Sequence, residues 1–204
     1  MVRIRNRGTA AAGIVGPAVL LLVVGLGAVW SPTYSWPGDP VSLIGMTGGW
    51  TAGLFNAGLV LGGLSLLPFG ARLWRVHSPL TGGLYAVVGL SLSGAGLFPA
   101  SQRTLHGLFG ALVFFGIPAV LWAAGAVDWR AGDRRSGATA FALGATALVV
   151  WLPYDFGMTW AQIGYGAAEL VSLLALAAWS VLTTVRLRDV SSPRSPDRRR
   201  ETRS

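Results

Sequence analysis

Six long apolar runs, separated by short polar segments that carry arginine, constrain the fold of this chain of 204 residues more than any other feature. The runs cover about residues 9–30, 49–71, 80–98, 106–127, 137–153 and 160–185. A run of about 20 apolar residues, at a rise of 1.5 Å per residue, crosses the hydrocarbon core of a bilayer. Charged residues make up 12% of the chain, against about 25% in an average soluble domain. We therefore predict an all-α, polytopic transmembrane bundle of six helices.

The distribution of arginine predicts the orientation of this bundle. If six helices alternate across the membrane, fifteen of the sixteen arginines fall on one side, and only Arg103 falls on the other. Because basic residues collect on the cytoplasmic side, we expect both termini in the cytoplasm. The predicted organisation is a basic cytoplasmic N-terminus (1–9), a transmembrane domain (10–187) and a disordered, basic cytoplasmic tail (188–204). The first run exceeds the apolar core of about 7–15 residues in a signal peptide, so we expect an uncleaved helix.

Composition also excludes several classes of function. The net charge of +8 does not indicate a nucleic-acid-binding protein, because the arginines lie at the ends of apolar runs, where they set orientation. The chain has no cysteine, which excludes disulfides and thiol catalysis, and no lysine, which excludes a Schiff base with retinal. His77 and His106 fall on opposite sides, so they cannot hold one haem. His106, Asp155 and Glu169 could supply three zinc ligands only if the fold brought them together. We predict no metal and no cofactor.

Glu169 is the most unusual residue for its position. It lies about nine residues inside the sixth run, roughly 13 Å below the membrane surface at the helical rise. An acidic side chain at the centre of a bilayer costs about 2.5–3.5 kcal/mol, so it normally faces protein or a wet cavity. Gln162, Tyr165 and Ser172 share its helical spacing and predict one polar stripe.

The alternating topology gathers further polar residues on the outer side. Asn56, Arg103, His106, Asp155, Tyr165 and Glu169 are all expected there, which predicts an outward-facing polar pocket. The inner half is expected to be almost entirely apolar. A structural interpretation stands beside the functional one, because helical membrane proteins also use buried polar side chains to hold helices together.

Several segments, taken in order, resemble a known family. They are Gly13–Pro17 (GIVGP), Ser31–Ser35 (SPTYS), Phe55-Asn56, Gly94–Pro99 (GAGLFP) and His106. Together they are similar to the prokaryotic membrane family catalogued as domain of unknown function 998, over residues 10–187. The resemblance implies a six-helix protein of a prokaryotic cell membrane with no established activity.

The sequence departs from this family at two places. Members often carry an acid in the stretch that reads Val41–Ile44 (VSLI) here, and many follow the glutamate of the last helix with arginine, where this chain has Leu170. A ligand site that depended on those residues would be altered in this protein.

Three functional hypotheses follow. The first is a protein that binds a lipid or small amphiphile, or docks a partner protein, in the outward-facing pocket. The second is a membrane-embedded lipid-modifying enzyme with His106 or Glu169 as general base. The third is a small proton-coupled transporter that uses Glu169. Whether the protein is an enzyme stays open, and the expected partners are membrane lipids and other membrane proteins, not nucleic acid.

Overall fold

The computed structural model describes residues 7–159 and 162–189, and within these ranges every regular element is helical. Six helices are long and apolar enough to cross a membrane, which confirms the predicted class of fold. The elements are α1 (Arg7–Trp30), the 3₁₀-helix η1 (Val41–Met46), α2 (Gly49–Val76), α3 (Pro79–Leu97), α4 (Arg103–Arg130), α5 (Arg134–Val149), the short α6 (Leu152–Asp155) and α7 (Tyr165–Asp189).

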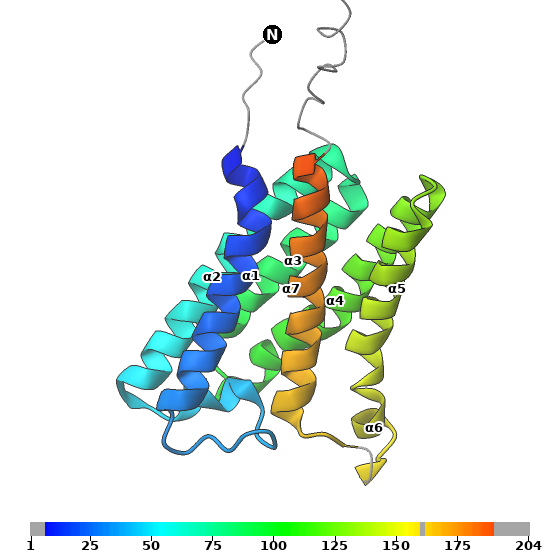
Figure 1. The fold of residues 1–204 in the computed structure, drawn as a ribbon. Helices are drawn as coiled ribbons and strands as arrows, with labels where there is room; N and C mark the ends of the chain where they lie inside the picture. Colours follow the sequence, from blue (N-terminus) through cyan, green and yellow to red (C-terminus); the bar gives the residue numbers. More distant parts are fainter. Residues whose placement is uncertain (1–6, 160–161, 190–204) are drawn as a thin grey trace, which may run out of the picture.

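The long helices form a closed ring in which neighbours along the chain are antiparallel (Figure 1). Each of α1 to α5 packs on the next long helix, and α7 closes the ring by packing on both α5 and α1. α1 begins and α7 ends at the same end of the bundle, which we name the terminal end. Residues 31–48 lie at the opposite end, which we name the cap end. The cytoplasmic location of the terminal end remains a prediction from the arginine distribution.

Three aromatic side chains from three helices fill the centre of the bundle. Trp179 of α7 lies 6.5 Å from Phe69 of α2 and 6.2 Å from Tyr85 of α3, measured between ring centroids. All three side chains are almost completely buried. The last helix therefore contributes to the core as well as to the wall, since it reaches helices that are not its neighbours in the ring.

Glycines bring α2 and α3 into backbone contact. Gly82, Gly89 and Gly96 recur every seven residues on α3, and Gly63 and Gly70 have the same spacing on α2. A Cβ atom on Gly89 would lie 2.8 Å from the carbonyl oxygen of Gly63, and one on Gly82 would lie 2.7 Å from that of Gly70. Such close approach is the typical use of small residues in membrane bundles. We name these five glycines the α2–α3 seam.

Several details differ from the sequence-based expectation. Residues 31–48 are not wholly a loop, because η1 forms once the last proline, Pro40, has been passed. The fifth run ends as a helix at Val149 and continues as α6. The last helix begins at Tyr165 instead of residue 160, since Gly164 has a φ of +95°, which a helix does not contain. Residues 188 and 189 extend α7, while 1–6 and 190–204 lie outside the described residues.

Candidate functional site

Glu169 fastens the segment at the cap end to the helical bundle. Its Oε2 atom accepts a hydrogen bond of 2.6 Å from the backbone N–H of Val41, the first residue of η1. The first N–H groups of a helical segment have no partner within it, so the carboxyl group satisfies a donor that the fold leaves free. Glu169 is only 9% exposed, although α7 begins at Tyr165 and so places it about 6 Å from the helix start instead of at the expected depth of about 13 Å.

Asn56 holds the other end of η1. Its side-chain amide donates a hydrogen bond of 3.0 Å to the carbonyl oxygen of Gly45. Val41 and Ile44 turn inward and are buried against the bundle. Glu169 of α7 and Asn56 of α2 therefore clamp one short helix between them, and we name residues 31–48 the cap segment.

The cap segment also covers the start of α7. The backbone N–H of Tyr165 donates to the carbonyl oxygen of Gly38 at 3.2 Å, and that of Ala167 donates to Pro37 at 3.4 Å. A Cβ atom on Gly164 would collide with this carbonyl oxygen of Pro37, so the close approach requires glycine there. The triplet Gly164-Tyr165-Gly166 thus serves the packing of the cap segment.

Tyr34 of the cap segment lies in the electric field of two acids. Burial raises the pKa of the Tyr34 phenol, and negative charge at Glu169 and Asp39 raises it further. Asp39 in turn accepts a hydrogen bond of 2.9 Å from the backbone N–H of Ser35, which tightens the turn of the segment. The acids and tyrosines that we expect on the outer side are therefore partly brought together here.

A cavity of about 60 Å³ lies beneath η1, between five of the long helices. Its walls are mainly apolar, with contributions from α1, α2, α3, α4 and α7: Val24, Phe55, Leu92, Val113 and Leu173. Only three polar side chains line it among the described residues, namely Ser42, His106 and Glu169. A larger groove of about 190 Å³ between α1 and α2 has no titratable side chain in its described lining, so it offers less chemistry.

His106 lies in the first turn of α4 and is half-buried. Its Nδ1 atom is 2.8 Å from the carbonyl oxygen of Phe98, the residue that follows α3. A carbonyl only accepts hydrogen bonds, so Nδ1 carries the proton. In the neutral imidazole, the Nε2 atom then offers a lone pair, and the ring remains able to accept a hydrogen bond from a ligand.

The other predicted site residues whose side chains the structure describes do not line this cavity. Arg103 is exposed at the start of α4, and Tyr165 is 45% exposed and packs on Tyr154, with ring centroids 4.4 Å apart. The side chain of Asp155 lies outside what the structure describes. The predicted stripe on the last helix also loses Gln162, which precedes α7 and donates to the carbonyl oxygen of Pro153.

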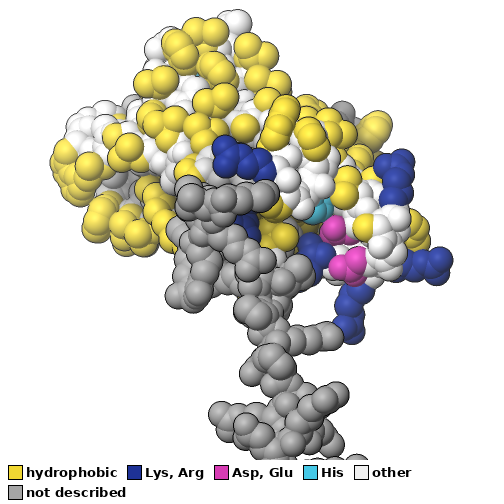
Figure 2. Space-filling model, turned by 90° about the horizontal axis from the view of Figure 1, so that it is seen from above, with side chains coloured by type: hydrophobic (Ala, Val, Ile, Leu, Met, Phe, Trp, Pro, Cys, Tyr) yellow, Lys and Arg dark blue, Asp and Glu magenta, His cyan; other side chains and the backbone are white. Residues whose placement is uncertain are grey.

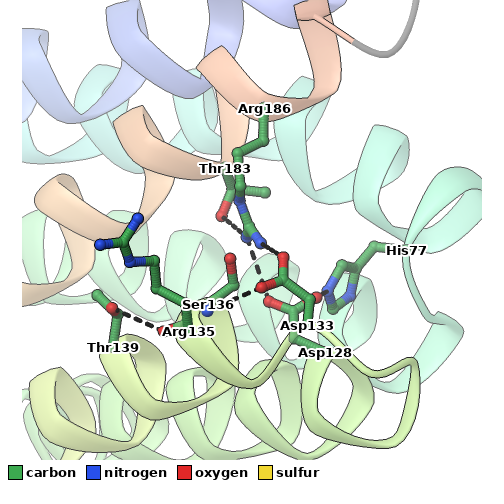
Figure 3. A network of polar contacts seen from close by, with 8 residues as sticks. All are labelled: His77, Asp128, Asp133, Arg135, Ser136, Thr139, Thr183 and Arg186. Carbon is green, nitrogen blue, oxygen red and sulfur yellow. Dashed lines mark hydrogen bonds and ion pairs between the residues drawn. The ribbon is translucent and has the colours of Figure 1, made fainter.

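Sequence reasoning missed a cluster of charged residues at the terminal end (Figures 2 and 3). Asp128 of α4 accepts hydrogen bonds from His77 at 3.0 Å and from Arg186 of α7 at 3.2 Å. Arg186 also donates to Asp133 at 3.1 Å and to the hydroxyl group of Thr183. In Figure 3, Asp128 lies between the imidazole and the guanidinium group. We name His77, Asp128, Asp133 and Arg186 the terminal cluster.

The terminal cluster corrects the expectation of an almost entirely apolar inner half. Asp128 is 8% exposed, and the side chain of His77 is also 8% exposed. Asp133 lies at the start of α5, where hydrogen bonds from Ser136 lower the pKa of its carboxyl group. The available signal was the pair of acids within an arginine-rich turn, because carboxylates there are expected to pair with neighbouring bases.

We expect the anchoring role of Glu169 to be visible in hydrogen exchange. Glu169→Leu leaves the buried N–H of Val41 without an acceptor, at a cost of about 1–3 kcal/mol. The amide of Val41 should then exchange at least about tenfold faster, measured by mass spectrometry on peptides from residues 37–46. Glu169→Gln, which keeps an oxygen acceptor, is the matched control and should exchange as the wild type does. Equal protection in all three proteins would contradict the anchoring role.

A membrane-spanning bundle with a clamped cap segment and a cavity beneath it is the class of protein that this fold and site define. Within that class, the chain belongs to the family described as "Protein of unknown function (DUF998)", whose model matches residues 14–186. This match confirms the resemblance drawn from the sequence. Searches of curated proteins and of solved structures found no match.

Proposed function

We propose that this protein binds a small amphiphile from the membrane in the cavity beneath η1. The observation that carries the proposal is the composition of the cavity wall, in which apolar side chains from five helices surround one carboxyl and one imidazole group. Ligand sites typically combine an apolar lining with a few polar groups that fix orientation. The arginine distribution favours an outer-leaflet location for this cavity, in the plasma membrane of a prokaryotic cell.

The chemistry of Glu169 supports a role beyond anchoring. The anchor to η1 needs only one hydrogen-bond acceptor, which the oxygen of a neutral amide can supply. The other end of η1 is held by a neutral amide, that of Asn56, which donates to Gly45. A buried carboxyl group is a costly choice, although Glu169 is only the fifth residue of α7, so the cost of about 2.5–3.5 kcal/mol at the bilayer centre is an upper bound for it. Ionisable groups inside a membrane protein generally indicate function, and the second oxygen of Glu169 is available to a ligand.

The alternatives find less support in the geometry. An enzyme with His106 and Glu169 as a catalytic pair would hold them within hydrogen-bond reach, and among the described residues no hydrogen bond joins them. A transporter needs a path past the midplane. Below Leu173, the core-facing side of α7 is closed by Leu176 and Trp179, which are both only 2% exposed. A docked partner protein stays an alternative occupant of the cap end.

Two glycines of α4 provide a matched test of the proposal. Gly110 lines the cavity and Gly107, one turn away, does not, and a Cβ atom on either would meet no atom within 4 Å. We expect Gly110→Leu to fill the cavity and Gly107→Leu to leave it open. Native mass spectrometry after mild extraction should detect a bound amphiphile on the wild type and on Gly107→Leu. The fraction of protein that carries the amphiphile should be at least about tenfold lower for Gly110→Leu.

Two results would overturn the proposal. One is a wild-type protein that carries no amphiphile and takes up none when lipid extract is added back. The other is equal occupancy in the two leucine variants, because the ligand would then lie outside the cavity. Thermal unfolding of both variants serves as the control for folding, and a specific complex with another protein would instead favour the docking alternative.

A further inference from the structure

The polar groups of the cavity define the chemistry of its ligand more narrowly than apolar walls alone. Glu169 already uses Oε2 to accept from Val41, and when it is ionised it has only acceptor sites left. His106 uses its Nδ1 proton on the carbonyl oxygen of Phe98, which leaves the Nε2 lone pair. Ser42 can donate or accept. Two of the three polar side chains in the lining therefore present acceptors.

No cation accompanies these acceptors. The lining among the described residues contains no arginine, and Arg103, one turn before His106 on α4, is exposed outside the cavity. A carboxylate or phosphate ligand would enter a site with a glutamate and without an opposing charge. Buried charges are normally paired, so this arrangement disfavours an anionic ligand.

The volume limits the polar group that can enter. A water molecule needs at least about 10–15 Å³ of cavity measured by a water-sized probe, so a cavity of about 60 Å³ holds only a few groups of that size. A terminal hydroxyl or amino group with its adjoining methylene groups fits this limit. A phosphodiester headgroup with its esterified alcohol is larger than this volume limit.

We infer that the ligand is an aliphatic chain whose tip donates hydrogen bonds, an alcohol or an amine, and that anionic amphiphiles are excluded. The inference rests on the proposed function, because it names the class of ligand for the same cavity. The tip donates to the free oxygen of Glu169 and to Nε2 of His106, the adjoining methylene groups lie against the apolar wall formed by residues such as Leu92 and Val113, and the rest of the chain extends out of the cavity.

Competition for a photoactivatable probe tests the inference on the full-length protein in nanodiscs. A dodecanol analogue with a diazirine in its chain labels the cavity, and unlabelled dodecanol, dodecylamine and dodecanoate compete at equal mole fraction at about pH 9, where Glu169 and dodecanoate are both ionised and dodecylamine is still protonated. We expect dodecanol or dodecylamine to reduce labelling at least about tenfold more effectively than dodecanoate, since hydrogen bonds to charged groups are the stronger ones. Dodecanol and dodecylamine are tested separately, and the stronger competitor shows whether the tip is a hydroxyl or an amino group.

Variants separate failure of the inference from failure of the proposed function. Glu169→Gln keeps an acceptor for Val41 but presents an N–H₂ donor to the cavity, so it should weaken competition by dodecanol and strengthen that of dodecanoate. Suppose that dodecanoate competes as well as dodecanol on the wild type, and that Gly110→Leu still loses labelling. This result would overturn the inference that the ligand must donate hydrogen bonds, while the proposal that the cavity binds an amphiphile would stand. Labelling unchanged in Gly110→Leu, compared with Gly107→Leu, would overturn both.

Discussion

Gly82→Val is expected to open the α2–α3 seam and to destabilise the protein by about 3 kcal/mol, at the upper end of the range for overpacked sites. A Cβ atom at Gly82 would collide with the backbone nitrogen of Trp74 and would lie 2.6 Å from its Cα atom. These are backbone atoms of α2, so no side chain can rotate away to make room. The two helices must separate, and dispersion contacts along the seam are lost with them.

The matched control is the same substitution at an exposed glycine of another helix, Gly25→Val in α1. Gly25 is exposed, and a Cβ atom there would meet no atom within 4 Å, so this variant carries the same change in helix propensity without the collision. Thermal unfolding in nanodiscs, followed by circular dichroism, measures both variants. The seam explanation fails if the midpoint of Gly82→Val matches that of Gly25→Val.

The fold was predictable because it depends on properties that each segment carries alone. The length, apolar content and flanking arginines of a run state whether it crosses a membrane, with no knowledge of its neighbours. Small residues at a spacing of four on the second run, Gly49, Gly53 and Ala57 as well as Gly58 and Gly62, also predict that another helix packs closely on it. Gly58 and Gly62 do pack on Val23 and Leu20 of α1, while Gly53 meets no neighbour within 4 Å.

The candidate site was predictable only in part, because its partners depend on tertiary contacts. The depth of Glu169 predicted a buried carboxyl group, and the structure buries it. Its partner is the backbone N–H of Val41, 128 residues away, and a backbone donor leaves no signature because almost every residue has one. Gln162 was misassigned because helical spacing alone could not reveal the break at Gly164.

The terminal cluster was missed for a different reason. Asp128 directly follows the fourth apolar run (106–127), so the sequence pattern places it in a polar turn, where an acid is normally solvated. The structure continues α4 to Arg130 and turns Asp128 inward. Its two partners, His77 and Arg186, come from elements that only the closed ring brings to the same place. Ion pairs between residues of different helices depend on the fold, so the sequence of a single apolar run does not predict them.

Asp128→Ala is therefore expected to cost about 2–3 kcal/mol in free energy of unfolding. Removing one partner of a buried ion pair typically costs about 3–5 kcal/mol, because the remaining charge is left uncompensated. The loss here is smaller, since the side chain of Arg186 is 34% exposed and water screens it. Asp133→Ala removes the other acid that binds Arg186, but its side chain is 49% exposed, so the expected loss is smaller still.

A triple variant can distinguish two causes of this loss of stability, namely uncompensated charge and lost hydrogen-bond geometry. In Asp128→Leu combined with His77→Leu and Arg186→Met, no buried unpaired charge remains in the cluster, because Asp133, which also loses Arg186, is 49% exposed. Well-packed apolar side chains commonly equal a buried ion pair in stability. We expect this triple variant to recover most of the stability that Asp128→Ala loses, measured by the same thermal unfolding. Recovery would assign the cost to uncompensated charge. A triple variant as unstable as Asp128→Ala would instead show that the hydrogen-bond geometry of Asp128 itself holds α2, α4 and α7 together at the terminal end.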